Sequence, residues 1–170
     1  MTDLILKENV SLKTLTTFKV GGDVRYLSEV KNDKELIASI KLAKVKKLPI
    51  FVLGGGSDIL ISDKKFNGMV VKYVGDEVKF KKMSSNVLVT AEAGLVWDDL
   101  VKVAVEKNLQ GIECMSGIPG TVGASPIQNI GAYGQELKDV FVILRAYDIK
   151  EENFVNLTKK DCEFTYRESM

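Results

Sequence analysis

The sequence predicts an α+β protein built of two lobes, and three observations carry this prediction. Helix-like and strand-like patterns occur before residue 74, a second set occurs after it, and a loop-rich stretch runs from 111 to 134. The first lobe is expected to span 1–74 and the second 75–170. At 170 residues the chain has room for two small lobes sharing an interface, and 45% hydrophobic content is enough for a core.

The first lobe reads as strand, helix and further strands. Residues 24–30 partly alternate between apolar and polar, as a half-buried strand does. Asn32, with Glu35 three positions later, predicts a helix start. Four apolar residues then share one helical face: Leu36, Ile37, Ile40 and Ala43. Pro49 ends this helix, and short strands are expected at 50–53, 59–61 and 69–71.

The second lobe begins with expected strands at 78–80 and 87–91. A helix is predicted by apolar residues at helical spacing, namely Trp97, Leu100, Val101 and Ala104. Asp98 and Asp99 suit the N-terminal turn of this helix, and Trp97 is interpreted as a core residue. Strands are expected at 140–148 and 154–157.

Composition excludes several function classes. The net charge is +1, with 24 basic and 23 acidic residues, so there is no electrostatic reason to expect nucleic acid or an anionic membrane as partner. The chain has no histidine, which removes histidine catalysis and histidine-containing metal sites. Cys114 and Cys162 are far apart, so we expect no metal site, no disulfide and a cytoplasmic location.

Neither the N-terminus nor the uncharged stretch 114–135 is typical of a secretion signal or a membrane span. The first ten residues lack the charged-then-apolar pattern of a secretion signal. Residues 114–135 carry no charge, but their glycines, prolines and polar side chains make a poor apolar helix. The sequence therefore predicts a soluble protein, and it leaves the oligomeric state open.

A first glycine-rich segment follows an apolar strand at Leu53-Gly54-Gly55-Gly56-Ser57-Asp58-Ile59. Consecutive glycines expose main-chain N–H groups to a ligand, and such a concavity binds phosphate. The segment matches neither a Walker A loop nor a GxGxxG fingerprint. A tight turn between two strands is an equally good reading of these residues alone.

The second segment, residues 111–134, holds six of the 14 glycines. Long loops in compact domains are usually functional or disordered, and this one is too apolar for disorder. It offers glycine N–H groups, the hydroxyls of Ser116 and Thr121, and the amides of Gln128 and Asn129. A neutral ring system or a pyrophosphate would suit it, while the alternative is a buried crossover that packs the lobes together.

Four motifs in order resemble the UDP-N-acetylenolpyruvoylglucosamine reductase family. They are Thr16-Thr17-Phe18, Gly54-Gly55-Gly56-Ser57, the run from Gly117 to Gly134, and Tyr166-Arg167-Glu168-Ser169. The resemblance covers nearly the whole chain. It implies the two-lobed FAD-binding fold of vanillyl-alcohol-oxidase type, with FAD held between the lobes.

The resemblance also implies a reaction. Family members reduce UDP-N-acetylglucosamine enolpyruvate in peptidoglycan precursor synthesis, with FAD as cofactor and NADPH as co-substrate. FAD supplies the redox chemistry, and the protein positions it and tunes charge.

Site residues carry over from the family motif by motif. The pyrophosphate cradle would be formed by Leu53, Gly54, Gly55, Gly56, Ser57, Asp58 and Ile59. The flavin and its linker would be lined by Ser116, Gly117, Ile118, Pro119, Gly120, Gly123, Gly131, Ala132 and Tyr133. Arg167 would be catalytic and face the substrate carboxylate, a role that suits an always-charged bidentate guanidinium, and Tyr166 would bind substrate beside it. Without the motif, Arg167 reads as a surface arginine.

Three departures from the family are visible. Asp58 replaces a usual asparagine and puts a carboxylate near the expected pyrophosphate, and Ser125 differs from the commoner small residue. Family enzymes also continue into a substrate-binding domain with a serine or cysteine proton donor and a glutamate, so we expect that domain to be absent here. Three hypotheses follow: the flavin-binding part of a reductase, an FAD- or nucleotide-binding fragment without turnover of its own, and another flavin oxidase of the same superfamily.

Overall fold

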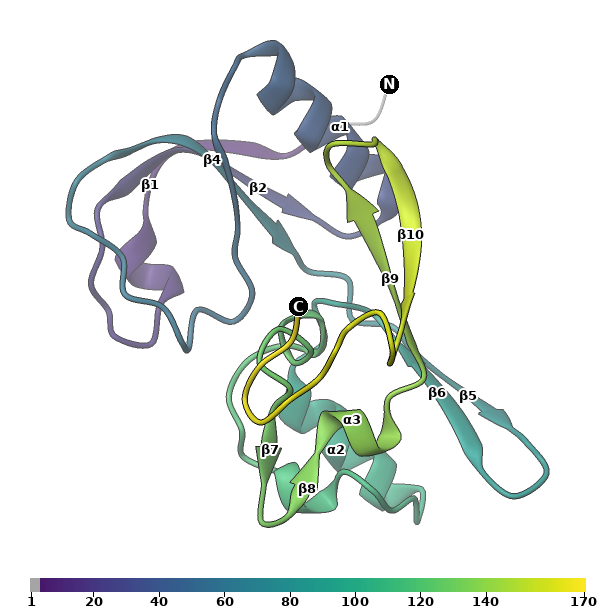
Figure 1. Ribbon diagram of the computed structural model, residues 1–170. Helices are drawn as coiled ribbons and strands as arrows, with labels where there is room; N and C mark the ends of the chain where they lie inside the picture. The colour runs from purple at the N-terminus through teal and green to yellow at the C-terminus, as the bar shows by residue number, and fades with distance from the viewer. Residues whose placement is uncertain (1–3) are drawn as a thin grey trace.

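The computed structural model describes residues 4–170, in which a sheet with one long helix lies beside a second, loop-rich half (Figure 1). The sheet has the strand order β1-β2-β4-β3. Its strands are β1 (Leu6–Ser11), β2 (Asp23–Val30), β3 (Ile50–Val52) and β4 (Phe66–Tyr73). β2 and β3 each pair in parallel with β4, and β1 pairs antiparallel with β2.

Helix α1 (Asp33–Val45) starts as its sequence predicts. The Asn32 side chain accepts a hydrogen bond from the Glu35 N–H at 3.0 Å, which satisfies one of the free donors of the first turn. The hydroxyls of Ser28 in β2 and Ser39 in α1 are both buried and lie 2.6 Å apart. This pair satisfies two polar groups inside the interface of helix and sheet.

The strand expected at 59–61 is wrong, and a strand that the sequence analysis did not expect, β1, is present. Residues 53–65 form an irregular loop between β3 and β4. Ile59 and Ile61 still pack against the core cluster that contains Leu53 and Val70. Their apolar character therefore reflects core packing from a loop, not a hydrogen-bonded ladder. β1 was missed because its sequence, LKENVS, is mostly polar and lies at the edge of the sheet.

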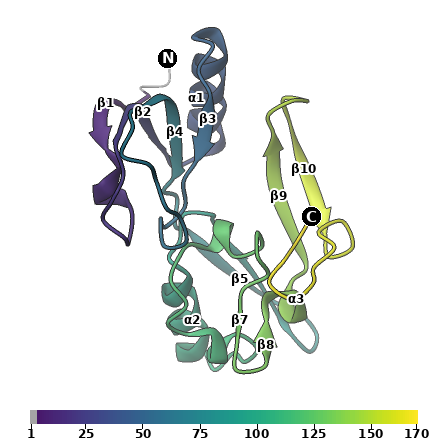
Figure 2. The same cartoon turned by 60° about the vertical axis from the view of Figure 1, so that its left-hand side comes forward.

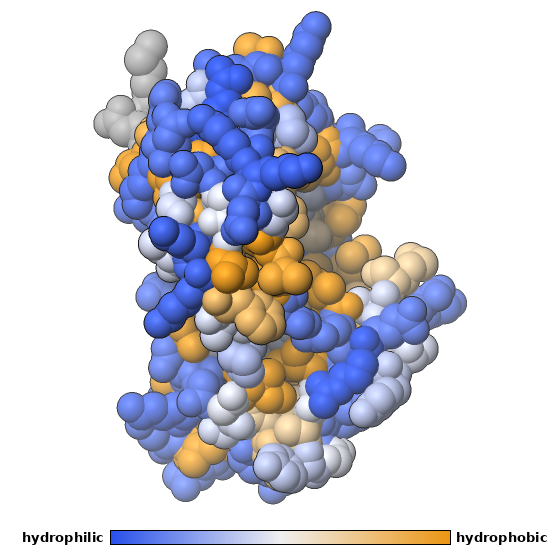
Figure 3. All heavy atoms as spheres, turned by 90° about the vertical axis from the view of Figure 1, so that its left-hand side faces the viewer, coloured by the Kyte–Doolittle hydropathy of each residue, from blue (hydrophilic) through white to orange (hydrophobic). Residues whose placement is uncertain are grey.

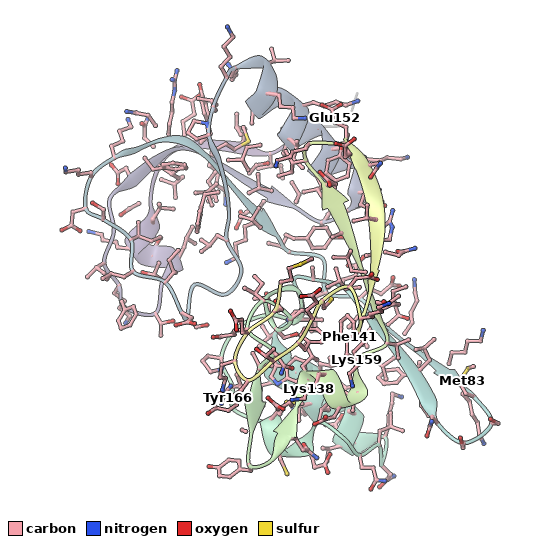
Figure 4. All side chains as sticks on the ribbon, viewed as in Figure 1. Met83, Lys138, Phe141, Glu152, Lys159 and Tyr166 are labelled. Atoms are coloured by element: carbon pink, nitrogen blue, oxygen red, sulfur yellow. The ribbon has the colours of Figure 1, made fainter. Side chains whose placement is uncertain are left out.

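The second half contains three hairpins and two helices. Its elements are β5 (Val78–Lys82), β6 (Val87–Ala91), α2 (Trp97–Glu106), β7 (Gly131–Ala132), β8 (Gln135–Glu136), α3 (Leu137–Val140), β9 (Ile143–Asp148) and β10 (Asn153–Thr158). The strand expected from residue 140 begins at Ile143 instead, because Val140 still belongs to α3. The β5–β6 hairpin projects from the body of the molecule and carries Met83 at its end (Figures 1 and 4).

The long loop is ordered, as its apolar content predicts. It contains two short 3₁₀ turns, at Glu113–Met115 and Val122–Ala124. A third 3₁₀ turn lies in the first half, at Leu12–Leu15. The Met115 side chain is completely buried against Trp97 and its neighbours in the core.

Three hydrophobic clusters make up the core. Two draw their members from residues 4–73, and the third draws its members from residues 78–141. This separation agrees with two lobes, while the boundary at 74/75 stays a prediction. Among residues 4–170 there is no helix with the length and apolar character needed to cross a membrane.

The β9–β10 hairpin reaches back to the first half and lies along α1 (Figures 1 and 2). Arg145 of β9 pairs with Asp33 at 2.7 Å. Lys44 of α1 pairs with Glu152 at 2.5 Å and donates to the Ile149 carbonyl at 2.6 Å. Glu152 lies at the turn of this hairpin, beside α1 (Figure 4). These contacts join segments more than a hundred residues apart in sequence.

Candidate functional site: two glycine-rich loops around a hollow

The two glycine-rich segments meet and enclose a hollow of about 240 Å³. It is lined by Phe51, Val52, Leu53, Gly54, Gly55, Gly56, Ser57, Asp58, Ile59, Trp97, Pro119, Gly120, Thr121, Ala124, Ser125, Ile127, Gln128 and Ile130. The segments lie more than fifty residues apart in the chain, and the structure brings them to one place.

The first loop is folded tightly onto the segment after β1. Gly56 has φ +68°, and a Cβ there would collide with the Leu15 carbonyl oxygen. The Gly56 carbonyl in turn accepts from the Thr17 N–H at 2.9 Å and from the Thr17 hydroxyl at 3.2 Å. Glycine at 56 is therefore required both by its backbone angle and by close packing.

The main-chain N–H groups of this loop are free. The Leu53 N–H donates to the Val71 carbonyl and continues the ladder of β3 and β4. Within residues 4–170, none of the N–H groups from Gly54 to Ile59 donates to a protein acceptor. Successive free N–H groups that begin with three glycines are suited to an anion such as a pyrophosphate.

The second loop is attached to the start of α2. The Trp97 N–H donates to the Gly120 carbonyl at 3.1 Å, and the indole Nε1 donates to the Met115 carbonyl at 3.0 Å. Trp97 is 2% exposed, so the interpretation as a core residue is confirmed, although the residue is also among those that line the hollow. Trp97 thus holds the loop on both sides of Gly117, through its indole N–H on one side and its main-chain N–H on the other.

Asp98 holds the middle of the same loop. Its Oδ1 accepts from the Ser116 hydroxyl and from the Gly117 N–H, both at 2.7 Å. The Gly117 N–H, followed by the Ser116 hydroxyl, lowers the pKa of the Asp98 carboxyl below its ordinary value. Asp98 is therefore both a residue of the first helical turn and an anchor for the loop.

The hollow has apolar side chains at its rim. Val52 is 64% exposed and Ile127 is 71% exposed, although both are large hydrophobic residues. Apolar side chains gather across the middle of one face of the molecule, at the level where the two halves meet (Figure 3). Among the lining residues that the structure describes, Asp58 is the one charged side chain, and it is exposed. An apolar rim beside free N–H groups fits a ligand with a flat ring system and an anionic linker.

Tyr166 and Arg167 lie on a tight turn near the end of the chain. The Thr165 N–H donates to the Glu168 carbonyl at 3.0 Å and closes this turn, in which Arg167 has φ +58°. Tyr166, which is labelled in Figure 4, is 81% exposed. Arg167 is also exposed. The Ser169 hydroxyl donates to the Ile127 carbonyl at 2.8 Å, so the turn contacts the second loop.

The other predicted flavin residues lie outside the lining of the hollow. Ser116, Gly117 and Ile118 precede the part that lines it. Gly123 packs so closely on Ala93 that a Cβ would lie 2.6 Å from the Ala93 Cβ. Gly131 and Ala132 form β7, and Tyr133 is 91% exposed with φ +49°.

Sequence reasoning missed some lining residues. Phe51 and Val52 were expected only as a buried strand, yet both are exposed at the rim. Ala124 and Ile127 carried no chemical signal beyond belonging to the second loop. The exposed end of β3, which is the edge strand of the sheet, could not be read from an apolar run that looks like any buried strand.

Comparison with known proteins decides the family. A model of the FAD binding domain matches residues 24–156. The chain belongs to the FAD binding domain family. This match covers both glycine-rich loops and both halves of the structure.

Within this family, the similarity to one enzyme runs along almost the entire chain. The UDP-N-acetylenolpyruvoylglucosamine reductase of Cutibacterium acnes is 41% identical over 163 residues, which is 95% of this chain and 43% of that protein. The reductase of Pseudomonas aeruginosa is 39% identical over 168 residues, which is 98% of this chain and 49% of that protein. The chain spans less than half the length of these relatives.

Solved structures agree with this FAD binding domain assignment. The crystal structure of the reductase from Thermus caldophilus superposes with a TM-score of 0.78 at 25% identity, covering 98% of this chain and 57% of that one. A cholesterol oxidase from Brevibacterium sterolicum superposes with a TM-score of 0.66 at 12% identity, covering 93% and 33%, which shows the fold alone. The predicted α+β fold of vanillyl-alcohol-oxidase type is confirmed.

Proposed function

We propose that this chain binds FAD in the hollow between the two glycine-rich loops, with lobes 1–74 and 75–170 as its two walls. The pyrophosphate lies against Leu53–Ile59, and the flavin with its linker lies against 116–120, Gly123 and 131–133. The free N–H groups from Gly54 to Ile59 carry this proposal, because they are donors that no residue between 4 and 170 satisfies. The apolar rim formed by Val52 and Ile127 supports a ring system beside them.

The chain is proposed to be the flavin-binding part of a cytoplasmic, NADPH-dependent reductase of UDP-N-acetylglucosamine enolpyruvate. Identity near 40% to reductases along almost its whole length supports this reading. FAD, when bound, supplies the hydride chemistry between NADPH and the enolpyruvyl group. Arg167 pairs with the substrate carboxylate and stabilises the negative charge that develops on hydride addition, and Tyr166 binds beside it.

The second candidate is FAD or nucleotide binding without turnover by this chain alone. Two observations favour it: Tyr166 is 81% exposed, and Asp58 is the one charged residue among the described lining residues. The residues around the hollow thus offer many groups that bind and few that transfer protons.

The first experiment is the visible absorption spectrum of the purified chain after incubation with FAD and removal of free cofactor. A retained flavin spectrum at one FAD per chain is expected, and a folded protein that retains none would contradict the proposal. Competition with ADP then separates the candidates for the ligand, because displacement of FAD by ADP at similar concentration indicates a nucleotide site with no use for the flavin ring. NADPH oxidation dependent on the UDP-sugar separates turnover from binding.

A further inference from the structure

Asn129 is a fully buried polar residue within the second loop, and it does not line the hollow. Its exposed fraction is 0%, and its φ of +42° places it in the left-handed region, which asparagine tolerates better than most residues. Its neighbours Gln128 and Ile130 both line the hollow. Gln128 and Ile130 therefore line the hollow, whereas the Asn129 side chain between them forms its contacts with other segments.

The Asn129 amide joins three segments. Its Nδ2 donates to the Thr165 carbonyl at 2.9 Å and to Glu136 Oε1 at 3.2 Å. Its Oδ1 accepts from the Lys138 N–H at 3.0 Å, in the first turn of α3. These three hydrogen bonds use both N–H donors and the oxygen acceptor of the Asn129 amide. No other side chain as short as asparagine offers two donors and one acceptor in this way.

The Thr165 contact matters most, because it holds the turn that carries Tyr166 and Arg167. This turn is closed by the Thr165–Glu168 main-chain bond and by the Thr165 hydroxyl, which donates to Glu168 at 3.2 Å. Two bonds tie it to the second loop: a part-buried one from the fully buried Asn129 and an exposed one from Ser169 to the Ile127 carbonyl. Buried hydrogen bonds suffer less competition from water, so the Asn129 bond is the stronger constraint.

We propose that Asn129 is a positioning residue, which fixes the Tyr166–Arg167 turn relative to the hollow so that the Arg167 guanidinium stays within reach of a bound substrate. This inference rests on the proposed function for the role of Arg167. The positioning itself concerns the protein without ligand and is tested separately.

The exchange Asn129→Asp tests the inference, because it keeps the acceptor for the Lys138 N–H and removes the donors to Thr165 and Glu136. Backbone ¹⁵N relaxation of the chain without FAD reports the mobility of residues 165–168. We expect order parameters near the rigid value of about 0.85 in the unchanged chain and below about 0.6 in Asn129→Asp at pH 7. The amides of α3 should stay rigid. A turn that is equally rigid in both proteins, or already mobile in the unchanged chain, overturns the inference.

A pH profile distinguishes positioning from general damage to the fold. The introduced carboxyl takes the place of an amide that contacts the Glu136 carboxylate and the Lys138 N–H. The Lys138 ammonium pairs with Glu136, Asp139 accepts from the Glu136 N–H, and Glu168 accepts from the Thr165 hydroxyl. Once protonated, the introduced carboxyl regains an O–H donor for the Thr165 carbonyl, so the turn in Asn129→Asp should become rigid again as the pH falls. Asn129→Leu has no such donor and should stay mobile at every pH. Equal behaviour of the two variants across the pH range contradicts the proposal.

The link to Arg167 is tested by a double-mutant cycle on the FAD-loaded chain, with UDP-N-acetylglucosamine enolpyruvate followed through the flavin spectrum. Asn129→Asp should weaken binding at least about tenfold in the unchanged background and have no further effect beside Arg167→Ala. Additive losses contradict action through Arg167. If the chain fails to load FAD, the proposed function fails, and the relaxation data still decide whether Asn129 positions the turn.

Discussion

Gly55 and Gly120 approach so closely that a Cβ on Gly55 would lie 2.9 Å from the Gly120 Cα. The two glycine-rich loops touch here, and they also approach where a Cβ on Gly54 would lie 3.2 Å from Thr121 Oγ1. Between Gly55 and Gly120 the atoms in contact belong to backbone on both sides, so neither loop can yield by rotating a side chain. Any side chain at 55 must therefore push the loops apart.

Gly55→Ala is expected to lower FAD affinity by at least about tenfold and the free energy of unfolding by about 1–3 kcal/mol, the usual cost of overpacking. Urea unfolding and FAD titration measure the two effects. Gly111→Ala is the matched control, since Gly111 has φ +122° and its nearest neighbour is the Val140 side chain, away from the hollow. The control should lose stability and keep its FAD affinity; equal loss of affinity in both variants would contradict the role of the loop contact.

Asp58→Asn should strengthen FAD binding. The Asp58 carboxylate is exposed at the lining of the hollow, where a pyrophosphate is proposed to lie. Two like charges about 4 Å apart in water repel by about 1 kcal/mol, so the affinity should rise a few-fold at low salt. The difference should shrink at about 0.5 M salt because of screening. Asp63→Asn, at an exposed acid outside this hollow, is the control and should change little.

The anchor between Asp98 and Gly117 should weaken in acid. Because the folded pKa of Asp98 is lowered, this carboxylate contributes stability above its unfolded value of 3.8 and loses that contribution as the pH falls through the lower folded value. The Gly117 amide chemical shift should therefore titrate with a midpoint below 3.8. Asp98→Asn should abolish that titration, whereas Asp99→Asn, in the same helical turn, should keep it. A midpoint at or above 3.8 contradicts the hydrogen-bonded anchor.

The hairpin β9–β10 should loosen from α1 when its polar contacts are removed. Lys44→Met deletes both the ion pair with Glu152 and the bond to the Ile149 carbonyl. Exposed pairs contribute little, so the loss of global stability should stay below about 1 kcal/mol. Amide exchange in 143–158 should rise all the same, since local opening needs less than global unfolding. Lys79→Met, which removes an exposed pair with the nearby Glu77, should leave that exchange unchanged.

Local signals in the sequence predicted local structure well. Asn32 and Glu35 are three residues apart, and their contact alone decides where α1 begins. The glycines at 54–56 likewise follow β3 after one residue, so a loop at the end of that strand could be expected. The apolar run at 59–61 wrongly predicted a strand, because an apolar pattern indicates buried side chains and does not indicate hydrogen bonding between strands.

Relationships between distant segments could not be predicted in the same way. Asn129 meets the Thr165 carbonyl, 36 residues further along the chain. The Gly55–Gly120 contact and the pairing of Lys44 with Glu152 also depend on how the two halves pack. The sequence shows that such residues can form hydrogen bonds or close approaches, and only the fold determines their partners.

The most direct measurement of the central claim is a titration of the chain with FAD followed through tryptophan fluorescence. Trp97 is the single tryptophan and forms part of the wall of the hollow. The account predicts saturable quenching of its emission at one FAD per chain, with the same saturation point in the visible flavin spectrum. Flavin retained without any change in Trp97 emission would place the cofactor elsewhere, and a folded chain that shows neither signal would contradict FAD binding between the two loops.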